Sequence, residues 1–141
     1  HGNFSKRLIK SPKLYFLDTG LLCYLLRISD AESLLTHPQR GAIFEAFVIS
    51  ETIKAFINVG IDPPLFFWRD RTGHEVDLVI EKGDELLPIE IKSGRTVVGD
   101  SFKGLKFWLA LEGNSQENGT LVYGGDKAFK RDAINLRPWF A

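Results

Sequence analysis

Chemistry is expected in this chain where charged residues interrupt two apolar strands. Asp77 lies in one alternating run of apolar and polar residues, and Glu90 and Lys92 lie in the next. Such alternation predicts strands, and a strand places residues two apart on the same face. Two carboxylates and an ammonium on one face could hold Mg²⁺ beside a phosphate, because Mg²⁺ prefers oxygen ligands and keeps water molecules for chemistry.

A hairpin would bring the two carboxylates side by side. A two-residue turn that begins at Gly83 makes Lys82 face Glu85. The same register opposes Asp77 to Glu90, with Cβ atoms about 4.5–5.5 Å apart, so bare carboxylates would repel unless they share a cation. An edge hairpin with a solvated charged face, or a cross-strand ladder of ion pairs, would explain the same alternation without any function.

The motif resembles a known catalytic signature. Asp77, followed after twelve residues by Glu90-Ile91-Lys92, is similar to the signature of the PD-(D/E)XK nuclease superfamily. The surrounding sequence resembles the DUF4143 family in the stretches 10–21, 41–48, 68–69, 75–77 and 88–94. The resemblance implies a nuclease-like domain at the C-terminal end of a prokaryotic AAA-type ATPase, behind a nucleotide-binding domain and a winged-helix segment.

The expected reaction is hydrolysis of a nucleic-acid phosphodiester. Asp77 and Glu90 would hold Mg²⁺ or Mn²⁺, and the resemblance adds the backbone carbonyl of Ile91 as a ligand. Lys92 is expected to stabilise charge on the phosphate, because an ammonium beside two carboxylates is a poor general base. The alternative is a catalytically silent nuclease-like module that docks a partner or regulates the attached ATPase.

Glu45 is expected to be a further site residue. A long helix is predicted over 42–59, and Glu45 shares its apolar face with Val48, Ile49 and Ile53. A buried carboxylate needs a cation, a metal or several donors, and nuclease-like folds bring an acidic residue from this first long helix to the metal. Alternatively, Glu45 could complement the positive end of the helix dipole at the rim of the domain.

The predicted fold class is α/β, a restriction-endonuclease-like core with a small mixed central sheet flanked by helices. The sheet would be a β-meander over 65–92 plus a further strand at 120–123. Helices are expected after caps at Asp18, at Ser29 or Asp30, and at Asp100. The helix after Asp18 carries an apolar stripe that predicts a core position. An extended segment is expected over 134–140, with its proline near a sheet edge.

Residues 18–141 are expected to form a single nuclease-like domain. Residues 1–17 would be a tag remnant and a basic lead-in strand, which the resemblance implies is the end of a truncated winged helix. A start at His-Gly-Asn without any Met indicates a piece of a longer protein. The upstream ATPase domain of the same chain is therefore an expected partner, and the oligomeric state is not encoded here.

Charge and composition limit the function classes. Eighteen Lys and Arg balance eighteen Asp and Glu, which argues against an autonomous DNA binder, so contacts to nucleic acid, DNA in the first place, must be local. Candidate contacts are Arg69 and Arg71, which could equally form surface ion pairs, together with Lys103 and Lys106. One cysteine excludes an internal disulfide or a thiolate zinc site, and no run is long enough to span a membrane, so a cytoplasmic protein is expected. No phosphate-loop motif occurs.

Overall fold

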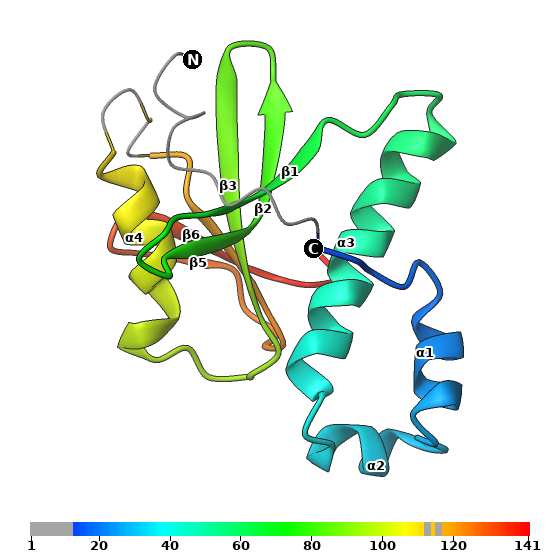
Figure 1. Ribbon diagram of the computed structural model, residues 1–141. Helices are drawn as coiled ribbons and strands as arrows, with labels where there is room; N and C mark the ends of the chain where they lie inside the picture. The colour runs from blue at the N-terminus through cyan, green and yellow to red at the C-terminus, as the bar shows by residue number, and fades with distance from the viewer. Residues whose placement is uncertain (1–12, 112–113, 115–116) are drawn as a thin grey trace. The chain divides into compact units, whose positions relative to one another are not determined.

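The chain divides into two compact units. The computed structural model describes residues 13–111, 114 and 117–141. One unit, Leu14–Pro63, is helical, and the other continues from Pro64 to Ala141 and includes Lys13 (Figure 1). Within the described residues no helix has the length and apolar character that crossing a membrane requires.

The second unit, called the sheet unit below, is built on a six-stranded mixed sheet. Its spatial order is β1-β2-β3-β4-β6-β5, in which β1 to β3 form an antiparallel meander and β4 joins β3 in parallel. β6 is parallel to β4 and antiparallel to β5. The strands are Leu65–Arg69 (β1), Glu75–Lys82 (β2), Glu85–Lys92 (β3), Thr120–Tyr123 (β4), Phe129–Arg131 (β5) and Ile134–Pro138 (β6). The structure therefore confirms a mixed α/β fold with the expected meander and parallel strand.

The β2–β3 hairpin has the predicted register. Lys82 pairs with Glu85, and the ladder continues to the pair Leu78–Ile89. Gly83 has a φ of 61°, a left-handed conformation that favours glycine in a tight turn. The turn therefore sets which residues of β2 and β3 are neighbours.

One helix covers a face of the sheet. A 3₁₀ turn at Gly99–Phe102 leads into α4, Lys103–Leu109, which packs on β2 and β3 (Figure 1). Phe102 and Leu105 are fully buried against Leu121 and the residues around it. The helix approaches β2 closely at Gly104, where a Cβ would lie 2.1 Å from the carbonyl oxygen of Glu75.

The helical unit contains three helices: Thr19–Leu25 (α1), Ala31–Thr36 (α2) and Arg40–Asn58 (α3). α3 packs against both α1 and α2. The caps follow the sequence prediction, because Asp18 accepts a hydrogen bond from Leu21 N and Asp30 accepts one from Ser33 N. Of the two residues expected to cap α2, the structure thus selects Asp30.

Three expectations about elements were wrong. Asp100 does not cap α4 but lies inside the preceding 3₁₀ turn. The part of the lead-in strand that is described, 13–17, is not a strand, because it forms no ladder with another segment. The stripe on α1 is not core, since Leu21 is 49% and Leu25 57% exposed. Periodicity identifies an apolar face but cannot say what covers it. The rest of the predicted lead-in, 1–12, lies outside the described residues.

Candidate functional site

Asp77 lies in a β-bulge of β2. Between its paired neighbours β2 has two residues, Asp77 and Leu78, where β1 has only Phe67. The extra residue takes Asp77 out of the regular ladder, and bulges of this kind often re-aim a side chain. The predicted direct pair of Asp77 with Glu90 is therefore absent, since the β2–β3 ladder ends at Leu78 and the bulge follows.

The Asp77 carboxylate instead binds the backbone of β3. Its Oδ2 accepts a hydrogen bond from Ile91 N at 2.9 Å, and the residue is only 4% exposed. The N–H and C=O of one strand residue point to the same side, so the Ile91 carbonyl is also directed toward β2.

Glu90 lies beneath the helical layer of the sheet unit. It is paired with Leu121 across the β3–β4 ladder, and paired residues share a face. Leu121 packs against Phe102 and Leu105, so Glu90 is on the face that α4 covers. This packing leaves Glu90 6% exposed.

The Glu90 carboxylate has too few donors for its burial. Oε1 accepts a hydrogen bond from Lys92 Nζ at 2.5 Å, whereas Oε2 is buried and has no hydrogen-bond partner among the described residues. Burial, and next the charge of Asp77, raise the pKa of Glu90 from an ordinary 4.5 to about 7, against the opposing effect of Lys92. Glu75 contributes a smaller rise to the same pKa.

Glu75, Asp77 and Glu90 each have a cationic side chain nearby. Besides the pair of Glu90 and Lys92, Arg69 Nε lies 3.8 Å from Glu75 Oε2. Lys13 Nζ lies 3.9 Å from Asp77 Oδ1. The site of the sheet unit is thus an array of alternating charges at the bulge, in which Asp77 and Glu90 are buried and their partners reach the surface.

The donor set fits a magnesium ion that keeps part of its water shell. Among residues 13–111, 114 and 117–141 no three His, Cys, Asp or Glu side chains form a group that could hold a metal. Mg²⁺ is usually bound through one or two carboxylates together with water and substrate phosphates, and it does not need a complete protein cage. Asp77, Glu90 and the carbonyl of Ile91 are donors of the kind that Mg²⁺ uses, and Oε2 of Glu90, which has no partner among the described residues, favours an added cation.

Comparison with known proteins decides the family. The model of DUF4143, a domain of unknown function, matches residues 40–139. The chain belongs to the DUF4143 family. A second domain of unknown function, DUF8612, matches residues 1–32. The match to DUF4143 begins at residue 40, the first residue of α3.

Relatives of this DUF4143 chain bring no activity with them. Uncharacterised proteins Rv2008c of Mycobacterium tuberculosis and Mb2031c of Mycobacterium bovis are each 39% identical over 94 residues. The alignment covers 67% of this chain but 20% of each relative, so the chain corresponds to about a fifth of those proteins. No solved structure matches the chain.

Glu45 belongs to the helical unit. It lies in the second turn of α3, is half-buried, and accepts a hydrogen bond from the hydroxyl of Tyr15 at 2.7 Å. This bond provides one of the donors that a partly buried carboxylate requires. Its role at a metal stays a prediction.

The four cations predicted to contact nucleic acid do not form one cluster of free charges. Arg69 pairs with Glu75, and Lys106 Nζ lies 2.7 Å from Asp132 Oδ2. Arg71 and Lys103 are exposed, the first in the β1–β2 turn and the second at the start of α4. The ion-pair alternative therefore describes Arg69, and Lys106 is paired although only a contact to nucleic acid was predicted for it.

Sequence reasoning missed Lys13 as a neighbour of Asp77. Lys13 was expected only as part of a basic lead-in strand, and no pattern connects position 13 with position 77. Sequence reasoning also gave no role to His74, which belongs to a hydrogen-bonded turn. His74 Nδ1 lies 3.1 Å from Asp70 Oδ2 and 2.8 Å from Thr72 Oγ1, and its ring stacks on Phe107. The Asp-x-Thr-Gly-His spacing is a local signal that could have predicted the turn.

Proposed function

We propose that the sheet unit is a nuclease-like domain that hydrolyses nucleic-acid phosphodiesters with Mg²⁺ bound at Asp77 and Glu90. The order of elements supports a restriction-endonuclease-like core, because a meander is followed by a helix and a strand parallel to β3. The chemistry of the motif, two carboxylates from neighbouring strands followed by a lysine, supports the reaction class.

One observation carries the proposal. A buried carboxylate normally collects hydrogen bonds, because an unsatisfied buried charge costs free energy of folding. Within the described part of the chain, Glu90 keeps a buried oxygen without a hydrogen-bond partner, and burial together with the charge of Asp77 raises its pKa. A site that sacrifices stability in this way is expected where a charged ligand binds.

In the proposed hydrolysis, different residues of the chain would have different roles. When bound, Mg²⁺ would acidify a water molecule and neutralise charge on the phosphate. The N–H of Ile91 fixes the orientation of Asp77, and the cover of α4 keeps water from Glu90. Lys92 is 40% exposed at the end of β3, so its ammonium is accessible to a phosphate while it still binds Glu90.

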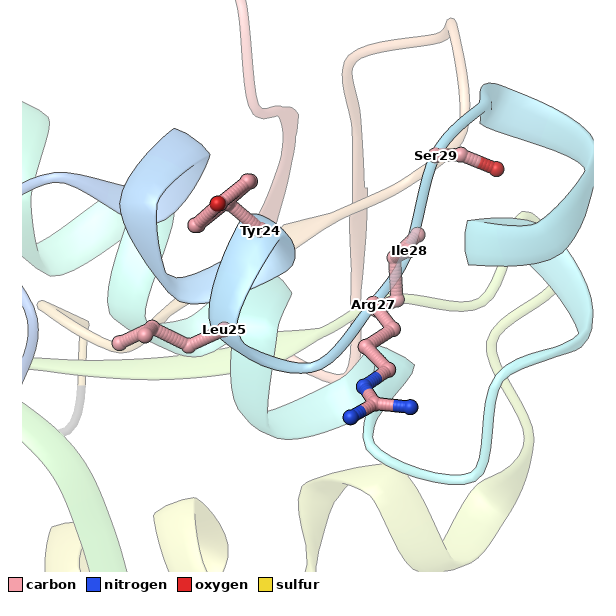
Figure 2. Close-up of a pocket in the computed structure, with 5 residues that line it drawn as sticks. All are labelled: Tyr24, Leu25, Arg27, Ile28 and Ser29. Atoms are coloured by element: carbon pink, nitrogen blue, oxygen red, sulfur yellow. The ribbon is translucent and has the colours of Figure 1, made fainter.

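A second function, a docking or regulatory module, is favoured by the surface of the helical unit. α1 exposes Leu21, Tyr24 and Leu25, with Tyr24 77% exposed. Figure 2 shows Tyr24 and Leu25 on α1, beside the loop residues Arg27, Ile28 and Ser29, around a surface pocket. Exposed apolar residues that adjoin a pocket are typical of contact surfaces. On this proposal the domain acts on a AAA-type ATPase to which it is attached.

Metal binding and cleavage separate the two functions. We expect wild-type protein to bind Mn²⁺ and to cut at least one member of a panel of single- and double-stranded DNA and RNA. Asp77→Asn should lose both properties, with cleavage reduced about 100-fold or more, since it removes a ligand charge. Lys92→Ala should lose cleavage to a similar extent but retain metal binding.

A matched control comes from the same hairpin. Asp84 is exposed in the β2–β3 turn, so Asp84→Asn removes a carboxylate without touching the site and should behave as wild type. Circular dichroism of each variant checks that it is folded. If wild-type protein neither binds Mn²⁺ nor cuts any substrate, the nuclease proposal fails and the docking module is preferred.

A further inference from the structure

Lys13 contacts the one oxygen of Asp77 that would face a metal. Oδ2 of Asp77 accepts the N–H of Ile91, and Lys13 Nζ lies 3.9 Å from Oδ1. The Asp77 side chain is 5% exposed and that of Lys13 28%, so this ion pair is partly shielded from water and from salt. Lys13 Nζ also lies 5.5 Å from the centre of the Phe67 ring, within the range of a cation–π interaction.

The charges around the bulge balance before any ion is added. Glu75, Asp77 and Glu90 are matched by Arg69, Lys13 and Lys92. A divalent ion that entered this array would add two positive charges. The three carboxylates of the array are already matched by the three cations and would not neutralise them. Its entry is therefore favoured when a cation leaves or when an anionic ligand binds with it.

Of the three cations, Lys13 is the one whose backbone is not part of a strand or helix. Lys92 belongs to β3 itself and donates a 2.5 Å hydrogen bond, and Arg69 belongs to β1 and pairs with Glu75. Lys13 belongs to no strand or helix, and its contact with Asp77 is long for a hydrogen bond. The Phe67 ring offers its ammonium a second favourable position.

We infer that Lys13 is a built-in counter-ion that occupies the cation position of Asp77 and competes with the divalent metal for Oδ1. This inference rests on the proposed function, since it names a regulator of the same site. Lys13 acts through Asp77 and is a positioning residue. Once displaced, its ammonium lies beside the metal and is available to the phosphate of an anionic substrate.

The test is a Mn²⁺ titration of the full chain, followed by electron paramagnetic resonance or calorimetry. Lys13→Gln should lower the Kd for Mn²⁺ by about fivefold, the size expected for loss of a partly exposed ion pair. Lys13→Arg keeps the charge and should bind like wild type, which separates charge from packing. Lys54→Gln is the matched control, because Lys54 forms an exposed pair with Glu51 in the helical unit.

A second readout follows the ammonium itself. In protein labelled with ¹³C at lysine Cε, the Lys13 resonance should move when Mg²⁺ is added, while that of Lys54 should stay. A metal that binds equally tightly, or more weakly, to Lys13→Gln than to wild type would overturn the inference and leave the proposed function standing. Binding by Lys13→Gln alone would support it strongly. If neither protein binds metal, the proposed function and the inference both fail.

Discussion

Asp70 and Glu90 are equally buried carboxylates in opposite situations. Asp70 is 7% and Glu90 6% exposed. Asp70 accepts hydrogen bonds from the backbone N–H and the hydroxyl of Thr72 and from the backbone N–H of His74. Burial alone would raise the pKa of Asp70, but these bonds, with one from the His74 ring, hold it at about 2. Glu90, with a pKa of about 7, has one such partner.

The difference follows from where the two residues lie. Asp70 begins the β1–β2 turn, whose N–H groups are not used by a ladder and converge on its oxygens. Glu90 lies in β3, where the ladder with β4 uses backbone donors and the N–H of Ile91 is taken by Asp77. The Glu90 carboxylate is therefore left to side chains or to an added cation. Degree of burial alone therefore does not distinguish a structural carboxylate from a functional one.

The largest change in the free energy of unfolding is expected at Asp70, the carboxylate that has several hydrogen-bond donors. Asp70→Ala should lower the free energy of unfolding by about 3 kcal/mol, because two backbone N–H groups and the hydroxyl of Thr72 lose a charged acceptor. Urea denaturation at pH 7 measures the change. Asp84→Ala, at an exposed turn position, should shift it by no more than about 0.5 kcal/mol. A loss below 1 kcal/mol at Asp70 would mean that the turn does not depend on its carboxylate.

Substitution of Glu90 is expected to raise the free energy of unfolding, whereas substitution of Asp70 lowers it. Between pH 4.5 and about 7 the folded protein keeps a proton that the unfolded chain releases, so Glu90 makes stability fall as the pH rises through this window. Glu90→Gln removes that fall and should stabilise the protein by about 2 kcal/mol at pH 8, with little effect at pH 4.5. Urea denaturation at both pH values measures it. Glu85→Gln, at an exposed position of the same strand, should show no such pH dependence. A destabilised Glu90→Gln at pH 8 would show that the carboxylate is satisfied after all.

A smaller effect, the gain in stability on Mg²⁺ binding, tests whether a metal ion neutralises Glu90. At a Mg²⁺ concentration ten times its Kd, the wild-type protein should gain about 1.4 kcal/mol, seen as a rise of a few degrees in Tm. Glu90→Gln should lose this gain because it lacks the ligand charge. Asp70→Asn should retain it, although its starting Tm is lower. Equal shifts in all three proteins would place the bound ion elsewhere.

Much of the local structure could be predicted because its causes lie within a few residues. The glycine turn and the two alternating runs determine the β2–β3 register, from Lys82–Glu85 to Leu78–Ile89. Asp18 and Asp30 cap their helices through bonds to backbone groups three residues away. Glu90 and Lys92 could be placed on one face of the sheet for the same reason, because residues two apart in a strand point the same way.

Other features required the assembled sheet. β5 is three exposed residues long and exists because β6 provides a partner, which no period in the sequence reveals. The bulge at Asp77 depends on how β1 and β2 pair over their whole length. The contact of Lys13 with Asp77 joins positions 64 residues apart.

The sequence by itself determined that two carboxylates and a lysine stand on neighbouring strands, because strand period and turn geometry act locally. Tertiary structure alone decided what those charges experience. Packing of α4 on the sheet removes water from Glu90, and the bulge turns Asp77 toward the N–H of Ile91. That bond and the β3–β4 ladder occupy backbone donors close to Glu90. Desolvation and donor supply arise from segments distant in the chain, so they appear only when the fold is complete.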